Sequence, residues 1–161
     1  MTTMTWRAMT AAEACDVADF WIAAGWPMTL AQTIDRAAGL GWTVEDEDFL
    51  VNEVSGLSMP DVDTATLPSG ELSTLTYRTT DVIRNVTEES MAFLNDQFTV
   101  LVREGTQRWG RPKLARLKNN TQQARWEIPS GARVSARCSA MAVLVEFTTP
   151  QYARVLRDLG E

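Results

Sequence analysis

The stretch ARWEIPSGARVSARCSAMAVLVEF, residues 124–147, predicts the centre of a β-sheet. It holds three short runs in which apolar and polar residues alternate, and Pro-Ser-Gly between the first two runs is typical of a turn. Trp126 and Ile128 alternate with Arg125 and Glu127, which is the pattern of a strand with one buried face. The buried face is expected to continue through Val134, Ala136, Cys138, Met141, Val143, Val145 and Phe147. Because the connections are short, we expect an antiparallel meander.

A long amphipathic helix is predicted before this meander. In TEESMAFLNDQFTVLVREGTQRWG, residues 87–110, Thr87 can cap the helix and Gly110 can end it. Apolar residues recur at helical spacing and form the expected core stripe: Met91, Leu94, Phe98 and Leu101. Residues 111–123 then read as a basic connector between the helix and the meander.

The first half of the chain predicts two more helices and a second set of strands. Two capping boxes, each a threonine followed three residues later by Glu or Gln, start helices over residues 10–25 and 29–41. Residues 42–56 read as one long strand or as a hairpin that turns at a run of acids. Residues 62–80 read as a hairpin around a Pro-Ser-Gly turn.

These elements predict an α+β fold in a single domain, residues 1–161. We expect one antiparallel β-sheet built from two meanders, with two N-terminal helices, one long central helix and a C-terminal helix that begins at Pro150. The order of the elements is similar to that of small secretion-chaperone-like domains. Such a similarity concerns fold and does not establish function.

The composition excludes several kinds of chemistry. The 161 residues include no histidine, which removes Ser-His-Asp and Cys-His catalysis and histidine-ligated zinc. The two cysteines, Cys15 and Cys138, are far apart in the sequence, so we expect reduced thiols rather than a disulfide framework. We predict no metal and no cofactor. The N-terminus has no apolar core of a secretory signal, and no apolar run is long enough for a membrane span, so we expect a cytoplasmic protein that does not bind membranes.

The net charge of −6 is divided unevenly along the chain. Residues 1–81 hold 3 arginines and 13 acids, a net −10, whereas residues 82–161 hold 12 basic residues and 8 acids, a net +4. The segment WTVEDEDFLVNE, residues 42–53, contains four consecutive carboxylates: Glu45, Asp46, Glu47 and Asp48. Asp61 and Asp63 follow closely, so a hairpin could gather all six carboxylates on one negative face for a basic protein partner.

Other interpretations of the acidic run remain open. A solvated turn is the plainest one. A calcium loop would need a glycine-kinked spacing of oxygen ligands that is absent here, and alternate acids of a strand face opposite sides of a sheet. A catalytic pair of carboxylates would need a cleft in which acids from different elements converge.

The second half contains the opposite charge. Residues 103–137 hold nine basic residues and two acids. Phosphate binding is conceivable, but the chain is acidic overall and contains no nucleic-acid motif, so we expect no nucleic-acid partner. Pairing with the acidic half, or a solvated sheet face, is the preferred interpretation. Among six tryptophans, Trp26 in the GWP break is the one most suspected of exposure and is a candidate partner-binding residue, although core or loop-anchoring packing is the preferred interpretation.

Several segments resemble a family of uncharacterised actinobacterial proteins. They are TWRAMTAAE at 5–13, LAQTIDRAAGLGW at 30–42, TTDV at 79–82, RWGRP at 108–112 and RWEIPSGARVSA at 125–136. These segments are structural rather than catalytic signatures, so the resemblance assigns no functional residue to this chain. Members of such families look like the small cytosolic partners encoded beside secreted polymorphic toxins. The resemblance therefore implies an immunity protein that binds and neutralises a basic toxin domain.

Two other classes of function remain as alternatives. A secretion-chaperone-like adaptor would bind an extended segment of its client rather than a folded toxin. An enzyme would have to work with carboxylates, tyrosine or arginine alone. A non-enzymatic protein-binding module is the expectation that agrees with both the composition and the resemblance.

Overall fold

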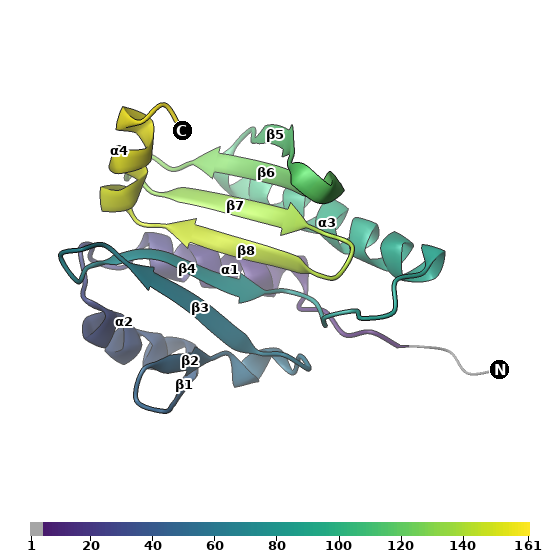
Figure 1. Ribbon diagram of the computed structural model, residues 1–161, viewed down its shortest axis with the longest axis horizontal. Helices are drawn as coiled ribbons and strands as arrows, with labels where there is room; N and C mark the ends of the chain where they lie inside the picture. The colour runs from purple at the N-terminus through teal and green to yellow at the C-terminus, as the bar shows by residue number, and fades with distance from the viewer. Residues whose placement is uncertain (1–4) are drawn as a thin grey trace.

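The computed structural model describes residues 5–161 and contains four α-helices and one eight-stranded sheet in that range (Figure 1). The helices are α1 (Ala11–Ile22), α2 (Leu30–Ala37), α3 (Glu88–Trp109) and α4 (Pro150–Asp158). The strands are β1 (Thr43–Glu45), β2 (Phe49–Val51), β3 (Asp61–Thr66), β4 (Leu72–Arg78), β5 (Lys113–Arg116), β6 (Gln122–Glu127), β7 (Arg133–Cys138) and β8 (Val143–Thr148).

The sheet is antiparallel throughout and has the strand order β1-β2-β3-β4-β8-β7-β6-β5. Strands β1–β4 form one meander and β5–β8 form the other, and the two are joined where β4 pairs with β8. The predicted α+β fold with two meanders, two N-terminal helices, a long central helix and a C-terminal helix is therefore confirmed.

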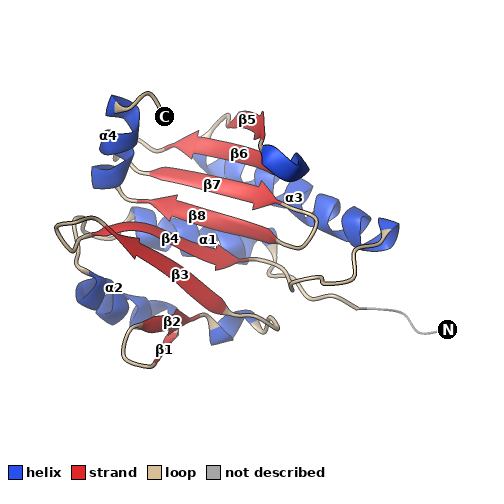
Figure 2. Ribbon diagram, viewed as in Figure 1, coloured by secondary structure: helices blue, strands red, loops and turns tan. Residues whose placement is uncertain are grey.

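The helices cover the two faces of the sheet unequally. In Figures 1 and 2, α1 and α3 lie behind the sheet, and α4 lies across one end of it. The core is formed between α1, α3 and the apolar side of the strands, where Trp126, Val134, Phe147 and Leu75 are opposite one another on neighbouring strands and are at most 1% exposed. We call the opposite side of the sheet the open face. Near α4 this face is covered, and there Arg133 is 5% exposed and donates to the Glu161 carbonyl.

The helix starts follow the local sequence signals. The Thr10 hydroxyl accepts from the Glu13 N–H, and the Glu13 carboxylate accepts from the Thr10 N–H. The same box forms at the start of α2, and Thr87 caps α3. These caps satisfy backbone N–H groups that have no partner within a helix, so the predicted starts agree with the structure.

Three details of the sequence prediction are wrong. The basic connector contains an edge strand, β5, whose four side chains are all exposed and therefore show no buried alternation. Met91 is 43% exposed, because the inward position in the first turn of α3 is occupied by Ser90. Met141 is 47% exposed, because it lies in the turn between β7 and β8, outside the alternating part of either strand.

Gly105 allows α3 to lie directly on the sheet. A Cβ atom at this position would be 2.7 Å from Cζ2 of Trp126 and 3.0 Å from Cζ3 of Trp109. The two indoles meet edge to face with their centroids 5.2 Å apart, and the Trp126 Nε1 donates to the Gly110 carbonyl at 2.9 Å. The absence of a side chain at Gly105 therefore lets the helix approach the Trp126 ring.

Replacing Gly105 by alanine is predicted to destabilise the fold. Alanine favours a helix over glycine by about 1 kcal/mol. Overpacking a core costs about 1–3 kcal/mol, and here the obstructing atoms belong to a fully buried indole. Urea unfolding should show a net loss for Gly105→Ala but not for the exposed neighbour Thr106→Ala. A Gly105→Ala protein as stable as the wild type would contradict this packing.

Candidate functional site

The acidic run forms the turn of the β1–β2 hairpin. Thr43 pairs with Val51 and Glu45 with Phe49, so residues 46–48 connect the strands. Asp46 and Glu47 have φ values of 48° and 72°, in the left-handed region that β-carbons disfavour. All four carboxylates are exposed, and none forms an ion pair within residues 5–161. The hairpin, rather than one long strand, is therefore the structure of this segment.

The pairing of β2 with β3 brings the other two candidate acids to this hairpin. Leu50 pairs with Val62 and Val51 with Asp61, and the next step of the same register places Asp63 opposite Phe49. Glu45, Phe49 and Asp63 thus follow one another across three strands on the open face. Asp48, Phe49 and Asp63 also line one shallow groove of about 310 Å³.

Phe49 is the residue at this place that the sequence analysis did not single out. Its side chain is 63% exposed, although it is a large apolar group within a strand. We define the acidic end as Phe49 together with the surrounding carboxylates: Glu45, Asp46, Glu47, Asp48, Asp61 and Asp63. It combines an exposed aromatic ring with a dense negative charge at one edge of the open face.

Trp26 is not part of the acidic end. It is half-buried, its Nε1 donates to the Trp21 carbonyl at 2.7 Å, and its ring lies 5.3 Å from that of Phe147. It does not line the groove next to Asp48 and Asp63. Its contacts anchor the chain between α1 and α2 to the core, and its role in partner binding stays an untested prediction.

The charge changes sign along one row of the open face. From Asp63 the row continues through Thr76 and Glu146, then through Ser135, Arg125 and Lys113. Ion pairs neutralise some of the basic residues on this face: Arg137 lies 3.2 Å from Glu146, and Arg133 lies 2.7 Å from Glu127. Within residues 103–137, five exposed basic residues form no ion pair: Arg103, Arg111, Lys113, Arg116 and Lys118.

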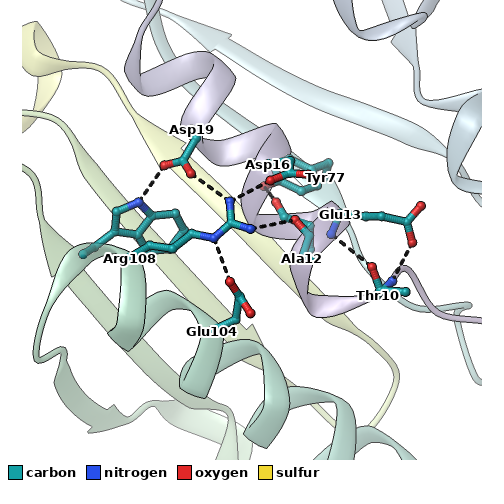
Figure 3. Close-up of polar contacts among 10 residues, drawn as sticks. Thr10, Ala12, Glu13, Asp16, Asp19, Tyr77, Glu104 and Arg108 are labelled. Carbon is teal, nitrogen blue, oxygen red and sulfur yellow. Dashed lines mark hydrogen bonds and ion pairs between the residues drawn. The ribbon is translucent and has the colours of Figure 1, made fainter.

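Arg108 shows the predicted pairing between the two halves of the chain. Its guanidinium lies 2.7 Å from Asp16, 2.8 Å from Asp19 and 2.8 Å from Glu104, which joins α3 to α1 (Figure 3). The hydrogen bonds to Glu104 and, to a smaller extent, to Asp16 raise the pKa of Arg108 above its ordinary value. Asp19 also accepts from Trp109 Nε1 at 2.8 Å. This cluster is explained by the packing of α3 against α1.

Asp81, in the TTDV segment, has a structural role as well. Its carboxylate accepts from the Arg7 N–H at 2.8 Å and from the Ser58 N–H at 2.9 Å. Burial acts to raise the pKa of Asp81, but these two donors and the Arg7 charge outweigh it and hold the pKa below its usual value. One carboxylate thereby ties together the segment before α1, the loop before β3 and the segment after β4.

The buried thiols and phenol are poor nucleophiles in this fold. Burial raises the pKa of Cys15 to about 12 and that of Cys138 to about 11. Burial also raises the pKa of Tyr77, whose hydroxyl donates to the Ala14 carbonyl at 2.8 Å. Both cysteines are free and buried. Within residues 5–161 no three Cys, Asp or Glu side chains are arranged so that they could hold a metal ion. In the same range, no helix has both the length and the apolar composition of a membrane span.

The fold and these surfaces define a class of small α+β domain in which one face of an antiparallel sheet is buried and the other presents opposite charges at its two edges. The chain belongs to a family of unknown function (DUF6301), whose sequence pattern matches residues 12–149. Comparisons with curated proteins and with solved structures gave no match.

The carboxylate of Asp81 generates a prediction with a pH dependence. Because the folded pKa is lowered, ionised Asp81 stabilises the fold above the usual carboxyl pKa of about 3.9, and this contribution is lost as the pH falls through the lowered pKa. Asp81→Asn should therefore lose about 1–3 kcal/mol at neutral pH, because one backbone N–H loses its acceptor.

Urea unfolding of Asp81→Asn and of the wild type at neutral and acidic pH checks this expectation. The difference between them should shrink as the pH approaches and passes below the carboxyl pKa. Asp96→Asn, at an exposed position on α3, is the matched control and should change little. If the difference in unfolding free energy between Asp81→Asn and the wild type stays constant with pH, ionised Asp81 is not the group that holds the three segments together.

Proposed function

We propose that the protein is a non-enzymatic binding module whose acidic end docks a basic protein partner, and that it acts as an immunity protein that neutralises a cognate toxin. The observation that carries the proposal is the position of Phe49. Its ring is 63% exposed on the open face, between Glu45 and Asp63 in the strand register. Folding gains little from an apolar side chain in water, whereas an interface gains by burying it.

The chemistry of the acidic end suits a basic partner. Few residues of an interface supply most of its binding energy, and aromatic side chains that become fully desolvated are common among them. The carboxylates around such an anchor attract a cationic surface before contact and so accelerate association. Because the six acids form no ion pair with the described residues, their charge is available to a partner.

The immunity function rests on the resemblance to cytosolic partners of secreted toxins. A protein of this kind needs neither cofactor nor catalytic group, and it must reside in the cytoplasm to protect the producing cell. An adaptor for an extended client is the alternative. Co-purification separates the two, because a folded basic domain supports immunity and a disordered client segment supports the adaptor. An enzyme would require a site in which polar groups converge on a substrate.

Neutralising the hairpin turn is predicted to slow association. A variant with Glu45→Gln, Asp46→Asn, Glu47→Gln and Asp48→Asn should bind the co-purified basic partner about tenfold more slowly at low salt, and its rate should depend less on salt. Its stability should be unchanged or slightly higher, since four neighbouring like charges are removed and asparagine tolerates the left-handed conformation of position 46. Stopped-flow association at low and moderate salt measures this.

A control with the same net charge separates the site from the overall charge. Four exposed acids elsewhere, Glu88, Glu89, Asp96 and Asp158, are neutralised in the same way. If both variants slow association equally, the total charge rather than the acidic end steers the partner. Phe49→Ala is the complementary variant: it should speed dissociation and cost about 2 kcal/mol or more of binding free energy. An unchanged dissociation rate would exclude Phe49 as the anchor.

A further inference from the structure

The opposite edge of the sheet has a free backbone. β5 pairs only with β6, and its four residues, Lys113–Arg116, are all exposed. Just after the strand, the Leu117 N–H donates toward β6, to the Thr121 carbonyl at 2.7 Å. Because antiparallel hydrogen bonding alternates along a strand, the N–H and C=O groups of Leu114 and Arg116 point away from β6. These groups are available to another strand.

A groove runs beside this free edge. It has a volume of about 460 Å³ and lies between α3, which contributes Phe98, Thr99 and Val102, and the β5–β6 hairpin. Leu114 pairs with the fully buried Ala124 and so is on the helix side of the sheet, yet it is 69% exposed. The groove therefore offers apolar surface at Phe98, Val102 and Leu114 and space for at least one further side chain.

The charges around the edge select its occupant. Arg116 also lines the groove, Lys113 is on the open face, and Arg111 and Lys118 flank the strand. Two copies of β5 paired antiparallel about Ala115 would bring the cations of both copies (Arg111, Lys113, Arg116 and Lys118) side by side. Residues 111–118 contain no acid to neutralise them, and neighbouring like charges destabilise such a pair. An acidic strand instead finds complementary charges on both faces.

We propose that β5 is a docking edge for an extended acidic segment of another protein, which adds to the sheet as an antiparallel ninth strand. The register of this added strand determines which side chains the segment needs. A side chain opposite Leu114 enters the groove. Because the strands are antiparallel, the side chain opposite Arg116 belongs to the residue two positions earlier in the segment. The matching segment therefore has an acidic residue opposite Arg116, any residue opposite Ala115, an apolar residue opposite Leu114 and an acidic residue opposite Lys113, in this order from its N-terminus. Backbone pairing supplies affinity, and the alternate side chains supply specificity.

A peptide fits this edge better than a nucleic acid does. The aromatic residue that lines the groove, Phe98, is 8% exposed, so its ring is not available for base stacking. The chain also has a net charge of −6, which opposes a polyanion beyond the local patch. A short acidic strand needs only the four local cations. This surface is on the edge of the sheet opposite the acidic end, so the proposal does not depend on the immunity function.

The test uses a short fluorescein-labelled peptide with the central sequence Glu-Thr-Leu-Glu and fluorescence anisotropy with the full chain. The control peptide has the order Glu-Leu-Thr-Glu, which keeps composition and charge but moves the leucine to the other face of the added strand. The first peptide should bind saturably at up to millimolar concentration, and the control should bind about tenfold more weakly. Two-dimensional NMR should place the chemical-shift changes in β5 and in the facing turns of α3.

Two variants test the register. Leu114→Ser removes an exposed apolar side chain and should weaken binding of the first peptide about tenfold without a change in stability. Arg116→Glu should weaken it at least as much, and a peptide with Lys-Thr-Leu-Glu at its centre should restore binding to that variant. Arg154→Glu on α4 makes the same change of net charge at an exposed position and should leave binding unaltered.

Three results would overturn the proposal. One is equal binding of the two peptides, or none at millimolar concentration. Another is tighter binding of a single-stranded oligothymidine than of the peptide, which would make the edge a nucleic-acid surface. The third is concentration-dependent self-association in sedimentation experiments that Arg116→Glu abolishes, which would assign the edge to a second copy of the chain. None of these results bears on the acidic end, whose variants are tested with a different partner.

Discussion

The close contact of α3 with the sheet at Gly105 and Trp126 is the constraint on which the other features depend. A helix that approaches an indole without an intervening side chain is fixed in height and position over β6 and β7. One turn further along, Arg108 joins the same helix to Asp16 and Asp19 of α1, so both covering helices are held on one side of the sheet. The helix is then placed too far from β5 to cover Leu114, and the groove beside that strand results.

The order of the strands converts an asymmetry of the sequence into an asymmetry of the surface. The first meander comes from the half of the chain with a net charge of −10 and the second from the half with +4. Because the meanders join through β4 and β8 at the centre of the sheet, the acidic hairpin and the basic edge strand come to lie at opposite edges. These opposite charges on separate edges are the basis of the two proposed partners, a basic protein surface at one edge and an acidic strand at the other.

The sequence predicts those parts of the fold in which local pattern and burial agree. The alternation of Trp126 to Val145 gives the central strands, and the threonine caps give the helix starts, because both signals arise between near neighbours. β5 escapes prediction because a strand with four exposed side chains shows no period. The exposure of Phe49 cannot be predicted from the local sequence either, because it depends on which strand pairs with β2 and on what covers the open face. Of the two alternatives that the sequence leaves open for residues 42–56, a long strand or a hairpin, the structure has the hairpin, with Glu45–Asp48 at its turn. The change of charge across the face follows from pairing between β4 and β8, which no local pattern specifies.

Hydrogen–deuterium exchange of the chain, alone and bound to its co-purified basic partner, tests most directly whether binding occurs at the acidic end. Backbone amides of residues 43–51 and 61–66 should become slower to exchange in the complex, because the partner covers the β1–β2 hairpin and the adjacent part of β3. The exposed sides of α1 and α3 should exchange at the same rate in both states. Protection confined to those helices, with none at the hairpin, would contradict partner docking on the open face.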